Sequence, residues 1–161
     1  MSEVFTRPVS TPVEYSKAVV ELVNHAQRTI DVLSPELTPV VFSTAELIDA
    51  ARAFAIRSQH TLMRVLIRNT TPLTRNDHRF LDIAQRLSSK VKVRKLAPDF
   101  QCRDDAFVIA DEEQFVLRRQ AVTWNGFHDS SRPEIARKLT VEFEEMWEHS
   151  TTDPGVRRLH I

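Results

Sequence analysis

Glycine is scarce in this sequence, with only Gly126 and Gly155 among its 161 residues. Loops of the GxGxxG and GxxxxGK types need several positions without a Cβ atom, because their backbone closely approaches a nucleotide phosphate. The sequence therefore excludes the binding of mononucleotides by a glycine-rich loop.

Cysteine is rarer still, since Cys102 stands alone. No disulfide can form within the chain, and a lone thiol is typical of a reducing compartment. The first residues lack the apolar run of a signal peptide, and no stretch reaches the roughly 18 apolar residues of a membrane span. We therefore expect a cytoplasmic protein with no membrane partner.

Net charge is also absent, because 22 basic and 22 acidic side chains cancel. A protein without a positive field lacks the diffuse attraction that draws many proteins to duplex DNA. We therefore do not expect nucleic acid as a partner. The six histidines are scattered without the two-ligand helical spacing of zinc enzymes, so we expect neither a metal nor another cofactor.

Helix starts are marked by a capping residue followed three positions later by an acid, which satisfies free backbone N–H groups at the first turn. Each mark precedes apolar residues at helical spacing. This pattern predicts four helices, beginning at Thr11, Ser43, Thr74 and Ser131.

Short runs rich in branched residues predict five strands, at residues 29–33, 62–67, 91–96, 106–110 and 115–117. Helices separate the first three strands, so these are expected to be parallel. About six residues join the third strand to the fourth, too few for a crossover, so the fourth should reverse and the fifth should follow as a hairpin. We predict one α/β domain over residues 1–161, with a core at 12–150, a tail at 151–161, and helices on both faces of a mixed sheet.

Polar residues follow or precede the predicted strands at one edge of this sheet, where open α/β sheets collect ligands. Arginines there suit phosphate or carboxylate, because a guanidinium binds such anions through two parallel hydrogen bonds. The alternative is a solvated network in which Asp104, Asp105 and Glu36 neutralise the arginines. The candidate ligand-binding residues are Ser34, Arg68, Asn69, His78, Arg103, Asp104, Asp105, Arg118, Arg119 and Trp124.

Two of these candidates have further interpretations. His78 begins the third helix and would serve either as a general base or as a neighbour of the helix cap. Trp124 opens an aromatic stretch, residues 124–128, that would either contact a ligand or partner or cover the core. A thiol triad formed by Cys102 and His78 is disfavoured because no oxyanion-binding group adjoins the cysteine.

The order of these elements, with a closing helix that ends at residues 143–150, resembles one half of the phospholipase D superfamily over roughly residues 12–150. In that superfamily the fourth strand carries His-x-Lys and, after four further residues, Asp; the histidine attacks phosphorus and the lysine neutralises the phosphate. Here the matching positions hold Asp104, Ala106 and Asp111. The resemblance therefore implies a half-fold without its nucleophile, in which Asp111 remains as the first residue of a type I turn.

The superfamily builds each active site from two halves, so the resemblance implies a homodimer. We expect a non-catalytic phospholipase D-like module, from a bacterial family of unknown function, that binds a small anion or a protein partner. The alternative is a dimeric hydrolase or phosphodiesterase that uses His78, Asp104 and Asp105 in place of the lost motif.

Overall fold

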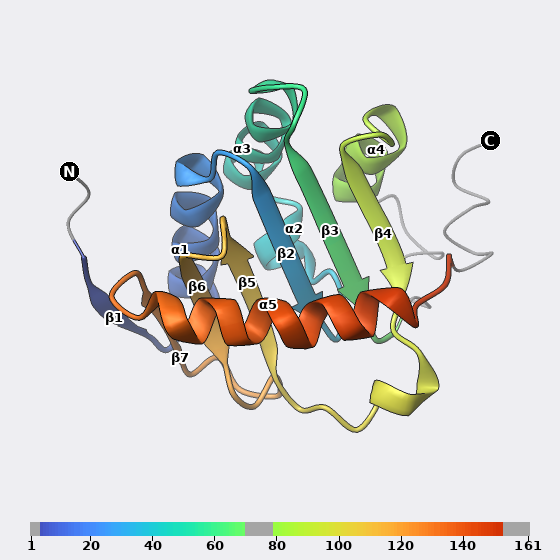
Figure 1. Cartoon of the computed structure of the whole chain (residues 1–161). Helices are drawn as coiled ribbons and strands as arrows, with labels where there is room; N and C mark the ends of the chain where they lie inside the picture. Colours follow the sequence, from blue (N-terminus) through green and yellow to red (C-terminus); the bar gives the residue numbers. More distant parts are fainter. Residues whose placement is uncertain (1–3, 70–78, 153–161) are drawn as a thin grey trace.

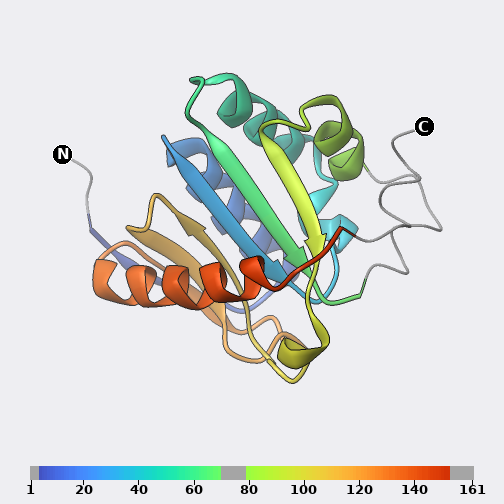
Figure 2. The same ribbon diagram turned by 45° about the vertical axis from the view of Figure 1, so that its right-hand side comes forward.

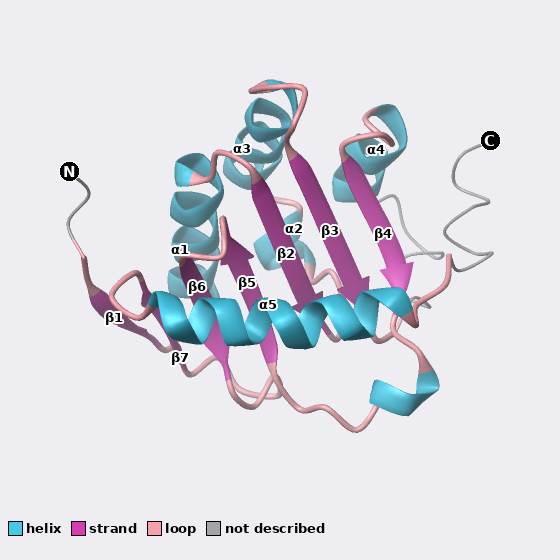
Figure 3. Ribbon diagram, in the orientation of Figure 1, coloured by secondary structure: helices cyan, strands magenta, loops and turns pink. Residues whose placement is uncertain are grey.

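The computed structural model describes residues 4–69 and 79–152, which form an open mixed sheet covered by helices on both faces (Figures 1 and 3). The sheet has seven strands in the order β1-β7-β6-β5-β2-β3-β4. Their bounds are β1 Thr6–Val9, β2 Thr29–Ser34, β3 Leu62–Ile67, β4 Val91–Lys95, β5 Ala106–Ala110, β6 Gln114–Arg118 and β7 Gly126–Asp129.

The strand directions follow the sequence prediction. β2, β3 and β4 are parallel, whereas β5 pairs antiparallel with β2 and forms a hairpin with β6. β4 is an edge strand, consistent with its alternating apolar and polar residues. β5 is buried at all five positions and lies in the middle of the sheet.

The fourth predicted strand reverses as expected but does not lie beside the third. The connection between β4 and β5 includes one 3-10 turn, Pro98–Phe100, and carries the chain past β3 and β2 at the lower edge in Figure 1. β5 then rises on the far side of β2, where Leu33 faces Phe107. This route places the start of β5 at the same edge of the sheet as the ends of β2 and β3.

Two strands were missed, so the expectation of about five is corrected to seven. β1 is four residues long and contains Pro8, which lacks a backbone donor and is tolerated at a sheet edge. β7 begins at Gly126, inside the stretch interpreted as an aromatic loop. A Cβ atom on Gly126 would lie 2.1 Å from the carbonyl oxygen of Leu117, so only glycine permits this close strand pairing.

Helices cover the two faces unequally (Figures 1 and 2). One face carries α1, α3 and α4 together with the short α2. The other face carries α5, which runs across the strands. Each face has its own apolar cluster. The helix bounds are α1 Pro12–His25, α2 Pro39–Phe42, α3 Ala45–Ile56, α4 Arg79–Arg86 and α5 Pro133–Glu148.

The predicted helix starts are found with small shifts where the structure describes them. The hydroxyl of Thr11 accepts the backbone N–H of Glu14 at the start of α1, whereas α3 is capped by Thr44 rather than Ser43. α5 begins after Arg132 without a side-chain cap. The predicted start at Thr74 lies outside the described residues.

A buried ion pair that the sequence interpretation missed holds α5 to the sheet. The guanidinium of Arg64 donates to both carboxylate oxygens of Asp31, at 3.0 and 3.3 Å, and lies 2.7 Å from a carboxylate oxygen of Glu144 on α5. It also lies over the rings of Phe143 and Trp147, at 5.2 and 5.5 Å. Burial raises the pKa of Asp31, and the hydrogen bond from Arg64 opposes that shift.

No helix in the described part of the chain combines the length and apolar character needed to cross a bilayer.

His128 lies inside the sheet rather than in a contact loop. It is 1% exposed, its ring packs edge-on against Phe5 at 4.7 Å, and its Nε2 atom lies 3.0 Å from the side-chain oxygen of Gln114. Burial lowers the pKa of His128 to about 4. The folded state therefore favours neutral imidazole, and protonation opposes folding.

This shift predicts a pH-dependent loss of stability. The stability contributed by neutral His128 is complete above its unfolded pKa of about 6.5 and is lost as pH falls toward about 4, and the total loss is about 3 kcal/mol. Chemical denaturation across this range should show a shallower pH slope for His128→Gln than for the wild type. The exposed-histidine control His60→Gln should keep the wild-type slope, and equal slopes in all three proteins would contradict the assignment.

Candidate functional site at the carboxyl edge of the sheet

The edge where β2 and β3 end is also the edge where β5 begins and β6 ends (Figure 1). Arg118 faces Ala106 across the β5–β6 ladder, and the next β5 residue, Phe107, faces Leu33 on β2. Ser34 follows Leu33, and the backbone N–H of Arg68 donates to the carbonyl of Ser34 at 3.1 Å. The backbone N–H of Asn69 donates to the carbonyl of Pro35 at 2.8 Å. Much of the predicted edge is therefore one contiguous row.

Arg118 points to the face covered by α1. Its side chain is 4% exposed, and its Nη1 donates to the carbonyls of Ala121 and Thr123, at 3.1 and 3.2 Å. The guanidinium carbon lies 4.5 Å from the ring centre of Tyr15 and 4.3 Å from that of Trp124. Its Nε atom is buried and has no hydrogen-bond partner in the described part of the chain.

Arg103 points to the opposite face, toward α5. Its Nε and Nη2 atoms donate hydrogen bonds to the carboxylate of Asp105 at 3.0 and 2.6 Å, while Nη1 donates to the carboxylate of Glu142 at 3.3 Å. The hydrogen bonds that Arg103 donates to Asp105 raise the pKa of Arg103. Arg103 and Arg118 therefore do not converge on one space, and at Arg103 the salt-bridge alternative describes the geometry.

A hollow of about 430 Å³ lies beside this salt bridge, between the ends of β5 and β6 and the first half of α5. Asp104 and Arg119 are exposed at its rim. Its further lining residues include Leu117, Lys138 and Glu142. Acids and bases alternate around it, so the hollow has no excess of positive charge for an anion.

Arg68 differs from Arg64 and Arg103 in the pairing of its guanidinium group. Arg64 and Arg103 each turn the Nε/Nη2 edge of the guanidinium toward an aspartate. The same two atoms of Arg68 are buried and have no hydrogen-bond partner in the described residues. Two adjacent buried donors without acceptors are uncommon, because each costs about 1–3 kcal/mol when left unpaired.

Asp104 and Ala106 occupy the positions of the superfamily's catalytic histidine and lysine. Ala106 is fully buried opposite Arg118, whereas Asp104 is exposed, with its backbone carbonyl accepting from the N–H of Ala121 at 2.6 Å. His78 lies outside the described residues. Cys102 is exposed.

Asp111 has a structural position different from the one predicted. It and Glu112 have φ angles of 55° and 58°, and the N–H of Glu113 bonds to the carbonyl of Ala110, so Asp111 is the second residue of a type I′ turn rather than the first of a type I turn. Its carboxylate accepts the backbone N–H groups of residues 27, 28 and 29 at 2.7–3.0 Å. Asp111 thus ties the hairpin to the start of β2.

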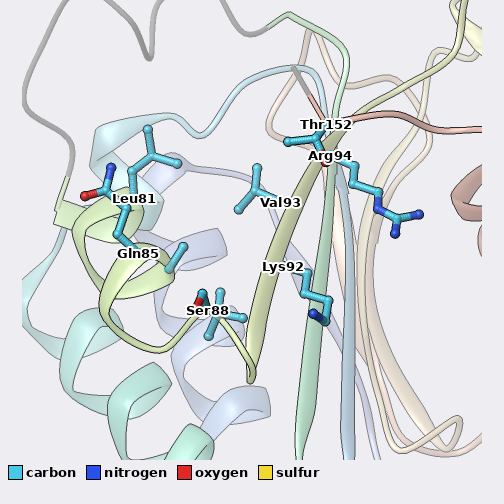
Figure 4. A pocket seen from close by; sticks show the side chains of 9 residues that line it. Leu81, Gln85, Ser88, Lys92, Val93, Arg94 and Thr152 are labelled. Atoms are coloured by element: carbon cyan, nitrogen blue, oxygen red, sulfur yellow. The ribbon is translucent and has the colours of Figure 1, made fainter. Parts of the chain in front are cut away.

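The structure describes no group of three or more histidine, cysteine, aspartate or glutamate side chains, within residues 4–69 and 79–152, that suits a metal ion. A separate hollow of about 190 Å³ lies between α4 and β4 (Figure 4). Leu81 and Gln85 flank it from α4, whereas Lys92 and Arg94 lie on the other side of β4. None of the predicted site residues lines it.

The chain belongs to a family described as a domain of unknown function, DUF7931, which matches residues 11–159. No curated protein matches the sequence.

Solved structures share the fold. TrmBL2, an archaeal chromatin protein described as showing a novel mode of DNA binding, is 17% identical with a TM-score of 0.64 over 94% of this chain. The chain spans 54% of the TrmBL2 chain. NucT from Helicobacter pylori, a phospholipase D-like nuclease, is 14% identical with a TM-score of 0.61, and the match covers 94% of this chain and all of NucT.

These neighbours contradict the expectation that nucleic acid is not a partner. The fold occurs in a DNA-binding chromatin protein and in a nuclease. That expectation rested on the zero net charge, which is a sum over the whole chain. Contacts with phosphate depend instead on where individual arginines lie.

The contribution of Asp111 to stability can be tested by substitution. Asp111→Ala should lower the free energy of unfolding by about 2 kcal/mol, because three backbone N–H groups lose an acceptor and alanine disfavours positive φ. Asp111→Gly removes the same carboxylate without the backbone strain, so chemical denaturation of both variants separates the two contributions. Wild-type stability in both would show that the carboxylate is dispensable.

Proposed function

We propose that this chain is a phospholipase D-like module that binds the phosphodiester groups of a nucleic acid without hydrolysing them. The fold likeness to NucT and TrmBL2 supports the nucleic-acid ligand. The residues at the carboxyl edge supply the argument for binding without catalysis.

Hydrolysis by the superfamily's route requires a nucleophile at position 104, just before β5, and a cation at position 106, its first residue. Asp104 carries a negative charge that repels a phosphodiester, and the methyl group of Ala106 stabilises no charge on phosphoryl oxygens. Ala106 is also fully buried, so its position offers no contact to a ligand. Both catalytic functions are therefore missing from this strand.

Arg68 carries the proposal for binding. Its Nε and Nη2 donors form the guanidinium edge that binds carboxylate or phosphate through two parallel hydrogen bonds. Arg64 and Arg103 show that this edge is paired with an acid elsewhere in the same sheet. A phosphate oxygen pair at Arg68 would satisfy two donors whose burial is otherwise costly.

The distance along the edge favours a polymer over a small anion. Three strand steps separate Arg118 on β6 from the end of β3, where Arg68 follows, which is roughly 14 Å at the usual strand spacing. A single phosphate group does not span that distance. A ligand with several phosphates in a row does.

The alternative of a hydrolase that uses His78, Asp104 and Asp105 has less support. Both carboxylate oxygens of Asp105 accept hydrogen bonds from Arg103, which leaves this residue poorly placed to take a proton from water. Asp104 is exposed and has no described catalytic partner.

Binding should be measurable by fluorescence anisotropy with labelled oligonucleotides at several salt concentrations. We expect saturable binding to the wild type. Arg68→Met should weaken it about tenfold or more, and should also reduce the salt dependence by about one phosphate contact. Arg68→Lys keeps the charge but loses the two parallel donors of the guanidinium edge, so it should also bind more weakly. The exposed Arg137→Met is the matched control and should bind as the wild type does.

Two results would overturn this function. One is the absence of saturable binding to any single-stranded or duplex oligonucleotide at low salt. The other is turnover of a phosphodiester substrate that disappears in His78→Ala or Asp104→Asn, because this would identify an enzyme.

We further propose a homodimer. The match covers all of NucT, so both chains have the length of one half of the superfamily's fold, and the superfamily joins two halves into one site. Size exclusion with light scattering at micromolar concentration should give twice the mass of one chain, 18.6 kDa. A monomer at every concentration tested would remove this part of the proposal.

A further inference from the structure

Trp124 packs against the apolar core beneath α1, yet it remains partly exposed at the surface. It lies in the loop between β6 and β7, at the carboxyl edge, and its side chain is half-buried. Its neighbour Val122 is 93% exposed, so this loop is on the surface of the protein. A large aromatic ring is therefore held at the same edge as the unpaired arginine donors.

The loop that carries Trp124 is held firmly by hydrogen bonds. Arg118 donates from Nη1 to the carbonyls of Ala121 and Thr123, and the N–H of Ala121 donates to the carbonyl of Asp104. Trp124 also meets the ring of Tyr15 edge-on at 5.6 Å. The indole is thus positioned before any ligand arrives, which reduces the entropic cost of using it for binding.

Arg118 also gives the indole a particular chemistry. The guanidinium lies 4.3 Å from the ring centre, in a cation–π contact on one side of the indole. The buried Nε of Arg118 has no partner among the described residues, so a hydrogen-bond donor lies beside the ring. An aromatic ring beside a fixed cation suits a nucleic-acid base, which stacks on the ring.

On the basis of the proposed function, we infer that the ligand is a single-stranded nucleic acid and that Trp124 stacks on one of its bases. In a duplex the faces of the bases are covered by their neighbours, so an indole reaches only groove edges and backbone. In an unpaired strand each base exposes a face that an aromatic side chain can cover. The strand would then extend along the edge from Trp124 and Arg118 toward Arg68.

An oligonucleotide that keeps its phosphates but lacks its bases separates stacking from phosphate binding. Anisotropy should show that the wild type binds a mixed-sequence single strand about tenfold more tightly than an abasic strand of equal length. Trp124→Leu should lose that advantage and bind both strands alike. The surface control Val122→Ala should behave as the wild type does.

A second readout comes from intrinsic fluorescence, since the chain has only Trp124 and Trp147. Trp147 lies on the buried side of α5 and is 8% exposed. Saturation with the single strand should quench the emission of the wild type, and Trp124→Phe should abolish most of that quenching while keeping part of the affinity. Thermal melts establish that each variant is folded, and should Trp124→Leu fail to fold, Trp124→Phe and the abasic strand still decide the question.

Failure of this inference differs from failure of the proposed function. Equal binding of normal, abasic and duplex oligonucleotides, with Arg68→Met still weakening all three, would overturn stacking by Trp124 and leave phosphate binding intact. Absence of binding to every oligonucleotide would overturn both.

Discussion

The antiparallel pairing of β5 with β2 is the constraint on which the rest of this molecule depends. It places β5 in the middle of a sheet whose other central strands are parallel, so one edge receives the ends of β2 and β3, the start of β5 and the end of β6. Asp111 holds this arrangement from the opposite edge, by joining the β5–β6 turn to the start of β2. Without the reversal, Arg118 and Arg68 would not share an edge.

The sequence was informative about the elements of this fold and about the reversal. Leu62–Ile67 and Ala106–Ala110 were predicted with their observed bounds, because continuous apolar runs mark strands covered on both faces. The short connection before β5 was enough to show that this strand turns back. Pro8 and Gly126 interrupted the strand patterns of β1 and β7, and β1 pairs with β7, a segment more than a hundred residues away.

The candidate site was predictable only in part. Strand order was enough to bring Ser34, Arg68 and Arg118 to one edge, but which face each side chain occupies depends on register and packing. Arg103 is paired with Asp105 and Glu142 on the α5 face, while Arg118 lies against Tyr15 and Trp124 on the other. The buried Asp31–Arg64 pair had a signal in the sequence, namely two charged residues at matched positions within apolar strands.

The central claim is that the guanidinium of Arg68 receives a phosphate, and arginine side-chain NMR tests it most directly. In a titration with a single-stranded oligonucleotide, the Nε–H resonance of Arg68, assigned by its loss in Arg68→Lys, should shift and saturate in step with the anisotropy. The Nε–H resonances of Arg64 and Arg103, whose Nε and Nη2 atoms already donate to aspartates, should not shift. An unmoved Arg68 resonance at saturating ligand would contradict the account.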